Sequence, residues 1–199
     1  HTGGRLNLQR ALSTTTNRPF NDDFANRARI TGLNVRARSS SVGATRESSE
    51  PVHAGVTGGA SLWWQWTAAS SGDVVIDTLG TDYDTALAVY QGTELSDLAL
   101  IGQSDNAGSV TTSRLPLTVS AGATYQIAVD GKGGSSGFTV LRVSSVPSND
   151  DVANASTVTG RSFRVDSTNR NASKQPNEPD HAGQNGGRSV WYRWTAPDS

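Results

Sequence analysis

The stretch that decides the fold is GGASLWWQWTA at residues 58–68, which returns 128 residues later as GGRSVWYRWTA at residues 186–196. Two further segments return with the same offset and without a gap. They are NDDFAN at 21–26, which becomes NDDVAN at 149–154, and EPVHAG at 50–55, which becomes EPDHAG at 178–183. Similarity within one chain at a fixed spacing indicates a tandem repeat.

The repeat divides the chain into three parts. Residues 1–18 precede it, residues 19–146 hold one complete copy, and residues 147–199 hold the first part of a second copy. The joint between the copies is Pro147-Ser148, which is too short a linker to let two modules tumble freely.

Apolar residues inside the complete copy alternate with a period of two, which is typical of half-buried strands. Leu62, Trp64 and Trp66 share one face of the first such segment, and turn-forming residues separate each segment from the next. About eight strands with no long helical pattern predict an all-β protein, an antiparallel β-sandwich of jelly-roll type. Seven of the candidate strands are residues 62–66, 73–78, 85–90, 99–103, 115–119, 125–129 and 137–143.

Composition excludes several classes of protein. The formal net charge is -1 with both signs spread along the chain, so neither a basic stripe for nucleic acid nor a polybasic face for a membrane is expected. No apolar run reaches the length of about 18 residues that a membrane-spanning helix needs. The chain has no cysteine, which excludes disulfides, thiolate metal sites and cysteine nucleophiles.

Four stretches of the complete copy, residues 21–26, 50–67, 80–90 and 122–131, together resemble the bacterial pre-peptidase C-terminal domain family. The resemblance implies a secreted, extracellular β-sandwich module that follows the catalytic domain of a bacterial protease and is either removed during maturation or binds substrate. A signal peptide is then expected upstream of His1.

The leading segment GGRLNLQRAL at residues 3–12 resembles the last helix of a subtilisin-like catalytic domain. Leu8, Ala11 and Leu12 stand at helical spacing and predict one short helix here. The resemblance implies a subtilisin-like serine protease domain upstream in the same chain. Its catalytic triad would lie outside these residues, so no residue here inherits a protease role.

The histidines give no sign of catalysis. His53 and His181 are one position in two copies, flanked by Ala-Gly, and no Gly-x-Ser-x-Gly nucleophile elbow accompanies them. We therefore predict no catalytic residue, and we expect His53 to make a loop hydrogen bond with its ring packed on a tryptophan. Asp82 and Asp84 could form the carboxylate pair of a glycosidase, about 5–10 Å apart in a cleft. The polar end of a hairpin is the favoured alternative.

Carboxylates that recur in both copies raise the question of calcium, which takes roughly six to eight oxygen ligands. In some collagenase members of the resembled family, calcium binds where the linker before the first strand meets a nearby loop. The alternative is that the paired aspartates cap a turn or short helix through Asn26. The candidate ligands are Asn21, Asp22, Asp23, Glu47 and Glu50.

The tryptophans offer a candidate binding surface. A period of two places Trp63 on the face opposite Trp64 and Trp66, and Trp191 takes the same position in the second copy. Flat aromatic faces stack on sugar rings and bury much area, so Trp63 and Trp191 are candidate contacts for a protein or polysaccharide substrate. Packing in the core or under loops is the favoured alternative.

The sequence is consistent with two functions. The first is a non-catalytic C-terminal accessory module of a secreted bacterial protease, serving substrate attachment, stability or processing. The second is an extracellular structural module in which residues 147–199 are completed by another chain, through strand exchange or filament assembly. Half a sandwich leaves apolar surface and unpaired strand edges, and both favour such self-assembly.

Overall fold

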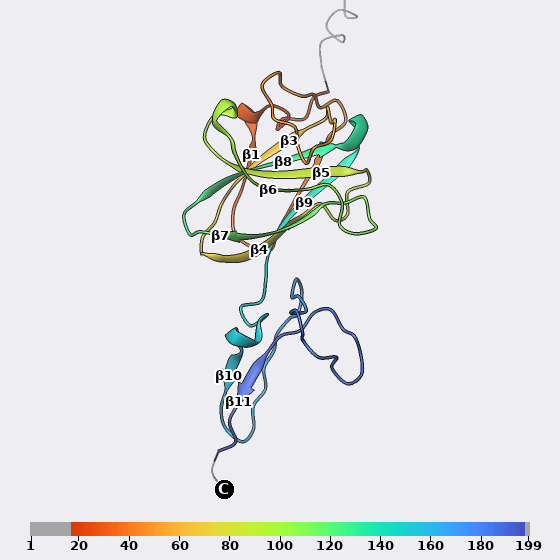
Figure 1. Cartoon of the computed structure of the whole chain (residues 1–199). Coiled ribbons are helices and arrows are strands. Elements are labelled where there is room, and N and C mark those ends of the chain that lie inside the picture. Colours follow the sequence, from red (N-terminus) through yellow and green to blue (C-terminus); the bar gives the residue numbers. More distant parts are fainter. Residues whose placement is uncertain (1–16, 198–199) are drawn as a thin grey trace, which may run out of the picture.

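The computed structural model describes residues 17–197, so the helix predicted at residues 3–12 lies outside the described residues. Two β-sheets face each other in the first copy, followed by a small two-stranded unit (Figure 1). The predicted all-β sandwich is confirmed. Within the described residues, no helix is long and apolar enough to cross a membrane.

Nine strands build the sandwich. The five-stranded sheet has the order β1-β3-β8-β5-β6 and the four-stranded sheet the order β2-β9-β4-β7. The bounds are β1 Ala28–Ile30, β2 Val35–Ser40, β3 Leu62–Thr67, β4 Gly72–Asp77, β5 Thr85–Gln91, β6 Ala99–Ser104, β7 Arg114–Val119, β8 Thr124–Gly131 and β9 Phe138–Ser145.

The strand prediction missed β1 and β2 and expected only antiparallel pairing. In the structure β1 runs parallel to β3, with Ala28 opposite Trp64. β1 has three residues, too few to reveal a period. β2 does alternate, but it places small residues inward and arginines outward, and so carries little apolar signal.

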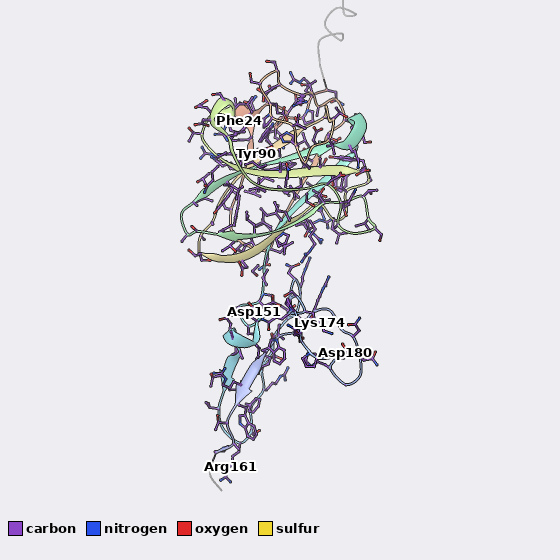
Figure 2. All side chains as sticks on the ribbon, in the orientation of Figure 1. Phe24, Tyr90, Asp151, Arg161, Lys174 and Asp180 are labelled. Carbon is purple, nitrogen blue, oxygen red and sulfur yellow. The ribbon has the colours of Figure 1, made fainter. Side chains whose placement is uncertain are left out.

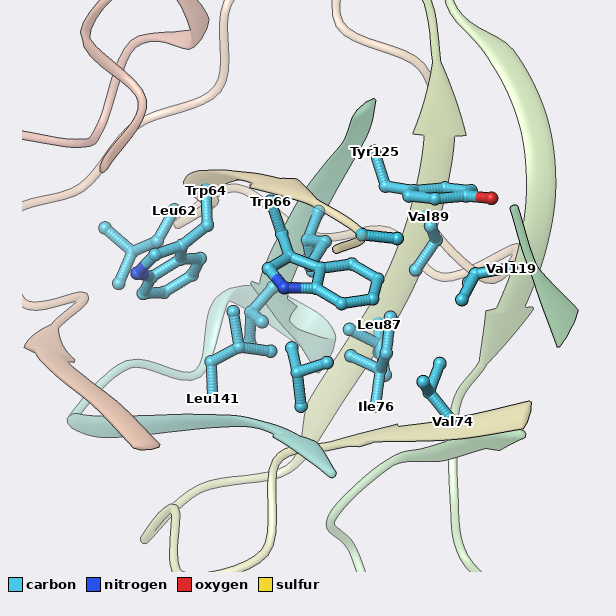
Figure 3. Packing of buried hydrophobic residues seen from close by; sticks show 14 residues of the cluster. Leu62, Trp64, Trp66, Val74, Ile76, Leu87, Val89, Val119, Tyr125 and Leu141 are labelled. Carbon is cyan, nitrogen blue, oxygen red and sulfur yellow. The ribbon is translucent and has the colours of Figure 1, made fainter. Parts of the chain in front are cut away.

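The core between the sheets is built on the period-two faces that the sequence predicted (Figure 3). Trp64 and Trp66 lie in it with 2 % and 1 % of their surfaces exposed. The indole N–H of Trp66 donates to the carbonyl of Gly32 at 2.9 Å, and its ring stacks on Tyr125 at 5.8 Å. The large ring is thus buried without leaving its polar atom unpaired.

A second apolar layer lies behind the five-stranded sheet. Its centre is Trp63, which packs edge-on against Phe24 at 5.0 Å and lies beside Tyr90. Phe24 belongs to the 3-10 turn η1, Phe24–Asn26. Residues 41–61, which connect β2 to β3, contribute the buried His53 to this layer.

The second copy repeats the opening of the first. The turn η4, Val152–Asn154, leads into β10, Ser156–Val158, which pairs in parallel with β11, Tyr192–Trp194. The register sets Ser156 opposite Tyr192, which is the pairing of β1 with β3 shifted by the sequence offset. Figure 1 shows β4 and β7, of the four-stranded sheet, on the side of the sandwich toward this unit.

Candidate functional site

A buried polar contact in the first copy joins three side chains, which we call the loop clasp: Glu50, His53 and Tyr90. His53 lies 2.7 Å from Glu50 through Nε2 and 2.8 Å from the hydroxyl of Tyr90 through Nδ1. Its ring meets Trp63 edge-on at 5.3 Å. The predicted loop hydrogen bond of His53, with its ring on a tryptophan, is confirmed.

Burial decides what the loop clasp can do chemically. His53 is 1 % exposed, and desolvation by burial, with the nearby Glu50 carboxylate, raises the pKa of the Tyr90 phenol. The phenol stays protonated and can donate to Nδ1, while Nε2–H donates to the carboxylate. Both ring nitrogens are engaged by protein groups, so the ring offers neither to a substrate.

The five predicted calcium ligands lie around the same loop, and each is engaged by the protein. Asp22 accepts from the backbone N–H of Thr45 at 2.6 Å and also pairs with Arg18. Further bonds run from Arg18 to Asp23 at 2.8 Å, from Phe24 N–H to Glu47 at 2.7 Å, from Glu47 N–H to Glu50 at 3.0 Å and from the Asn21 amide to Trp63 carbonyl at 3.1 Å.

This arrangement does not fit a calcium ion as it stands. The guanidinium of Arg18 occupies the space that a cation between Asp22 and Asp23 would need. Among residues 17–197, no three histidine or carboxylate side chains are grouped so that they could hold a metal. Calcium binding stays a prediction, and it requires Arg18 to leave both aspartates.

The second copy reproduces several of these contacts, but not those of Arg18, whose position is taken by Val146. Ser173 N–H donates to Asp150 at 2.6 Å, Gln175 N–H donates to Glu178 at 2.9 Å, and His181 lies 2.8 Å from Glu178. Gln175 replaces Glu47, and its neutral amide oxygen accepts from Val152 N–H at 2.9 Å. An uncharged acceptor therefore serves at a position where a calcium ligand was predicted.

The Glu178 carboxylate of the second copy is held in its charged form. The hydrogen bond from the Ser189 side chain, helped by Gln175 N–H and His181, lowers the pKa of Glu178 to about 2. Because its pKa is lowered, this carboxylate stabilises the folded loop at pH values above its pKa in the unfolded chain. The contribution is lost as the pH falls through about 2.

The two copies differ in how well the histidine is covered. His181 has no counterpart of Tyr90 among the described residues, and its side chain is 53 % exposed. It meets Trp191 edge-on at 5.5 Å, and both rings line a hollow of about 360 Å³ with Lys174 and Val190. The binding role predicted for Trp191 stays a prediction, with this hollow as its place.

The exposed binding role predicted for Trp63 is wrong, because its exposed fraction is 0 %. The period of two correctly placed it on the face opposite Trp64. It could not reveal that η1 and the segment before β3 fold over that face. Figure 2 shows Phe24 and Tyr90, which flank Trp63, at the end of the sandwich distant from Lys174 and Asp180.

The other carboxylate candidates, Asp82 and Asp84, also belong to loop structure. Asp82 accepts from the backbone N–H of Phe138 at 2.8 Å, and the carbonyl of Asp84 accepts from Lys132 N–H at 3.0 Å. They lie in the connection from β4 to β5, which passes from the four-stranded to the five-stranded sheet, so the predicted polar loop role holds but the predicted hairpin is wrong.

Sequence reasoning missed a gathering of arginines where the two copies meet. A hollow of about 250 Å³ there is lined by charged side chains from strands of the first copy and loops of the second. They come from five separated segments, and no local motif marks them in the sequence. They are Asp77, Arg114, Arg142, Arg170 and Arg188.

Comparison with known proteins gives only distant likenesses. No protein-family model and no curated protein sequence matches the chain. The pre-peptidase C-terminal domain of collagenase from Bacillus anthracis is 15% identical with a TM-score of 0.40, covering 58% of this chain and 92% of that one. The Aeromonas hydrophila periplasmic inhibitor of g-type lysozyme is 16% identical with a TM-score of 0.38, covering 59% and 95%. A family 35 carbohydrate-binding module from an environmental isolate is 19% identical with a TM-score of 0.29, covering 48% and 80%.

The two histidines form a matched pair for testing the loop clasp. We expect His53→Ala to lower the free energy of unfolding by about 2–4 kcal/mol, because it leaves the buried Glu50 carboxylate and Tyr90 hydroxyl without their partner. His181→Ala should cost less than about 1 kcal/mol, since that side chain is half exposed. Urea unfolding followed by tryptophan fluorescence measures both. Equal losses of unfolding free energy in the two variants would contradict a stabilising role specific to the buried histidine.

Calorimetry tests the calcium prediction directly. If calcium binds at Asp22 and Asp23, titrating calcium into protein pretreated with a chelator releases or absorbs heat. Arg18→Gln should then strengthen calcium binding, because the competing guanidinium group is removed. No heat and no rise in Tm for either protein would end the idea.

Proposed function

We propose that this chain is an extracellular, non-catalytic binding module that serves a secreted bacterial protease. One observation carries the proposal: the histidine of the complete copy is sealed in the loop clasp, with both nitrogens held by Glu50 and Tyr90. Histidine and glutamate, which serve as acids and bases in many enzymes, here hold a loop against a sheet. A sandwich with its loops fixed in this way is a rigid platform for surface contacts.

The protease partner is proposed from sequence. The repeat resembles modules that follow protease catalytic domains, and the segment at residues 3–12 resembles the end of a subtilisin-like domain. A module tethered to a protease raises the local concentration of substrate near the active site, because the second encounter becomes intramolecular. Insoluble protein or polysaccharide is the proposed substrate class.

Retention on insoluble material tests this function. We expect the 199-residue chain to sediment with insoluble proteins such as collagen, elastin or keratin and to release no peptides from them. Bovine serum albumin in the same buffer is the control for passive adsorption. Absence of retention on every protein and polysaccharide tried, or hydrolysis abolished by His53→Ala, would overturn the proposal.

A second candidate function, self-assembly, is favoured by the exposed apolar side chains of the second copy. Trp194 is 48% exposed, whereas its counterpart Trp66 is 1% exposed. Tyr192 and Phe163 are 37% and 51% exposed, whereas their counterpart Trp64 is buried in the core of the first copy and their counterpart Val35 packs against it, partly buried. The second copy therefore presents as surface what the first copy buries between its sheets.

Sedimentation velocity separates self-assembly from a monomeric module. If copies complete one another, the weight-average mass rises with concentration, and Trp194→Ser with Phe163→Ser returns the chain to a monomer. A monomer over the whole micromolar range would contradict assembly and leave the binding function standing.

A further inference from the structure

A groove runs along the seam between the two copies. The arginine-lined hollow of about 250 Å³ is adjoined by another of about 590 Å³, and the two share Ala107, Arg114 and Arg188 in their walls. One wall is the outer face of the four-stranded sheet, and the other is the loop of the second copy around Asn171. The Asn171 amide ties the walls together by donating to the carbonyl of Ser145 at 3.1 Å. We call this feature the seam groove.

Strand register places the first charges of the seam groove. Asp77 near the end of β4 lies opposite Arg114 of β7 on one side and Arg142 of β9 on the other. Residues directly opposite each other in neighbouring strands project to the same face, so these three side chains form one row. Asp77 is the single carboxylate among the residues lining the two hollows.

That carboxylate is already engaged. Arg142 donates to Asp77 at 2.8 Å, and the N–H of Leu79 donates to the same oxygen at 3.0 Å. Arg114, Arg170 and Arg188 are exposed and form no side-chain hydrogen bond or ion pair with any residue that the structure describes. In a chain with a net charge near zero, three unpaired guanidinium groups beside one groove are a local excess of positive charge.

We propose that the seam groove binds an extended acidic peptide segment through Arg114, Arg170 and Arg188. Guanidinium groups present parallel donors that match a carboxylate in a two-pronged fashion, which makes arginine suited to recognising Asp and Glu side chains. The groove takes its guanidinium groups from both copies, so it exists only where the repeat continues past Pro147. The inference deepens the proposed function, on which it rests, by naming the class of partner.

The remaining lining favours a peptide over an acidic polysaccharide. Leu79 and Val110 project into the groove wall with 54 % and 48 % of their surfaces exposed, which suits the aliphatic side chains of a peptide. Sugar rings are recognised by flat aromatic faces. None of the residues lining the two hollows, all within the described part of the chain, is aromatic.

Fluorescence polarisation tests the proposal with a short fluorescein-labelled peptide in which Asp and Glu alternate with Leu and Val. The matched probe carries Asn and Gln in place of the acids. We expect the 199-residue chain to bind the acidic probe and to bind the amide probe about tenfold or more weakly. Arg114→Gln with Arg188→Gln should weaken the acidic probe about tenfold, because two ion pairs are lost.

Arg29→Gln is the control variant, since Arg29 is exposed on β1 of the other sheet and its loss removes the same charge. It should change affinity by less than about twofold. Equal binding of the two probes, or an unchanged affinity in the double arginine variant, would overturn the seam groove. If polygalacturonate displaces the labelled probe as effectively as the unlabelled acidic peptide does, the groove binds polysaccharide instead.

The outcome is distinguishable from failure of the proposed function. The chain could be retained on insoluble protein while neither competition by free acidic peptide nor the arginine substitutions reduce that retention. In that case the binding role of the seam groove is wrong, and the module binds through another surface. If nothing retains the chain, the proposed function fails as well.

Discussion

The hydrogen bond between the buried Glu50 carboxylate and the His53 ring is the contact on which the first copy depends. Residues 41–61 connect the two sheets without regular structure, and so long a segment is costly to order. Glu50 fixes it from within by accepting from Glu47 N–H and from His53, and His53 then reaches Tyr90 of the sheet. The connection also meets the sheet at Asp130 of β8, which accepts from Gly59 N–H and Ala60 N–H at 3.0 Å, so the contact of His53 with Tyr90 is one of several that join it to the sheet.

The covered face of β3 follows from that contact. Trp63 lies between the loop and the sheet, touching His53 and Tyr90, while its neighbours Trp64 and Trp66 fill the space between the sheets. One strand therefore carries large rings on both faces, and only one of those faces is covered by a sheet. The other needs the clasped loop, which explains why the Glu-Pro-x-His segment accompanies the tryptophan strand in both copies.

Comparison of the two copies shows which contacts form locally and which need the whole sandwich. The bonds from Ser173, Gln175 and His181 to their carboxylates match those of the first copy in partner and length, so they do not require the rest of the sandwich. The burial of Trp194 does not recur, because it requires facing strands that the described part of this copy does not supply. The seam groove depends on both parts, with one wall from a completed sheet and one from a clasped loop.

The sequence predicted what is encoded locally. The fixed offset and the alternation of β3, β7 and β8 were sufficient for the sandwich, and the shared position of His53 and His181 was sufficient for a loop role. Three features depend on distant segments and could not be predicted. The short β1 carries no period, the cover over Trp63 comes from a loop, and the arginines of the seam groove converge from strands and loops far apart in the chain.

Hydrogen exchange of individual backbone amides tests most directly whether the loop contacts that the two copies share form without the rest of the sandwich. The amides of Ser173, Gln175 and Trp191 should be protected in the second copy, as those of Thr45, Glu47 and Trp63 are in the first, although protection in the second copy will be lower in magnitude. Exchange of Ser173 and Gln175 at the rate of an unfolded chain, with the first copy still protected, would contradict the account.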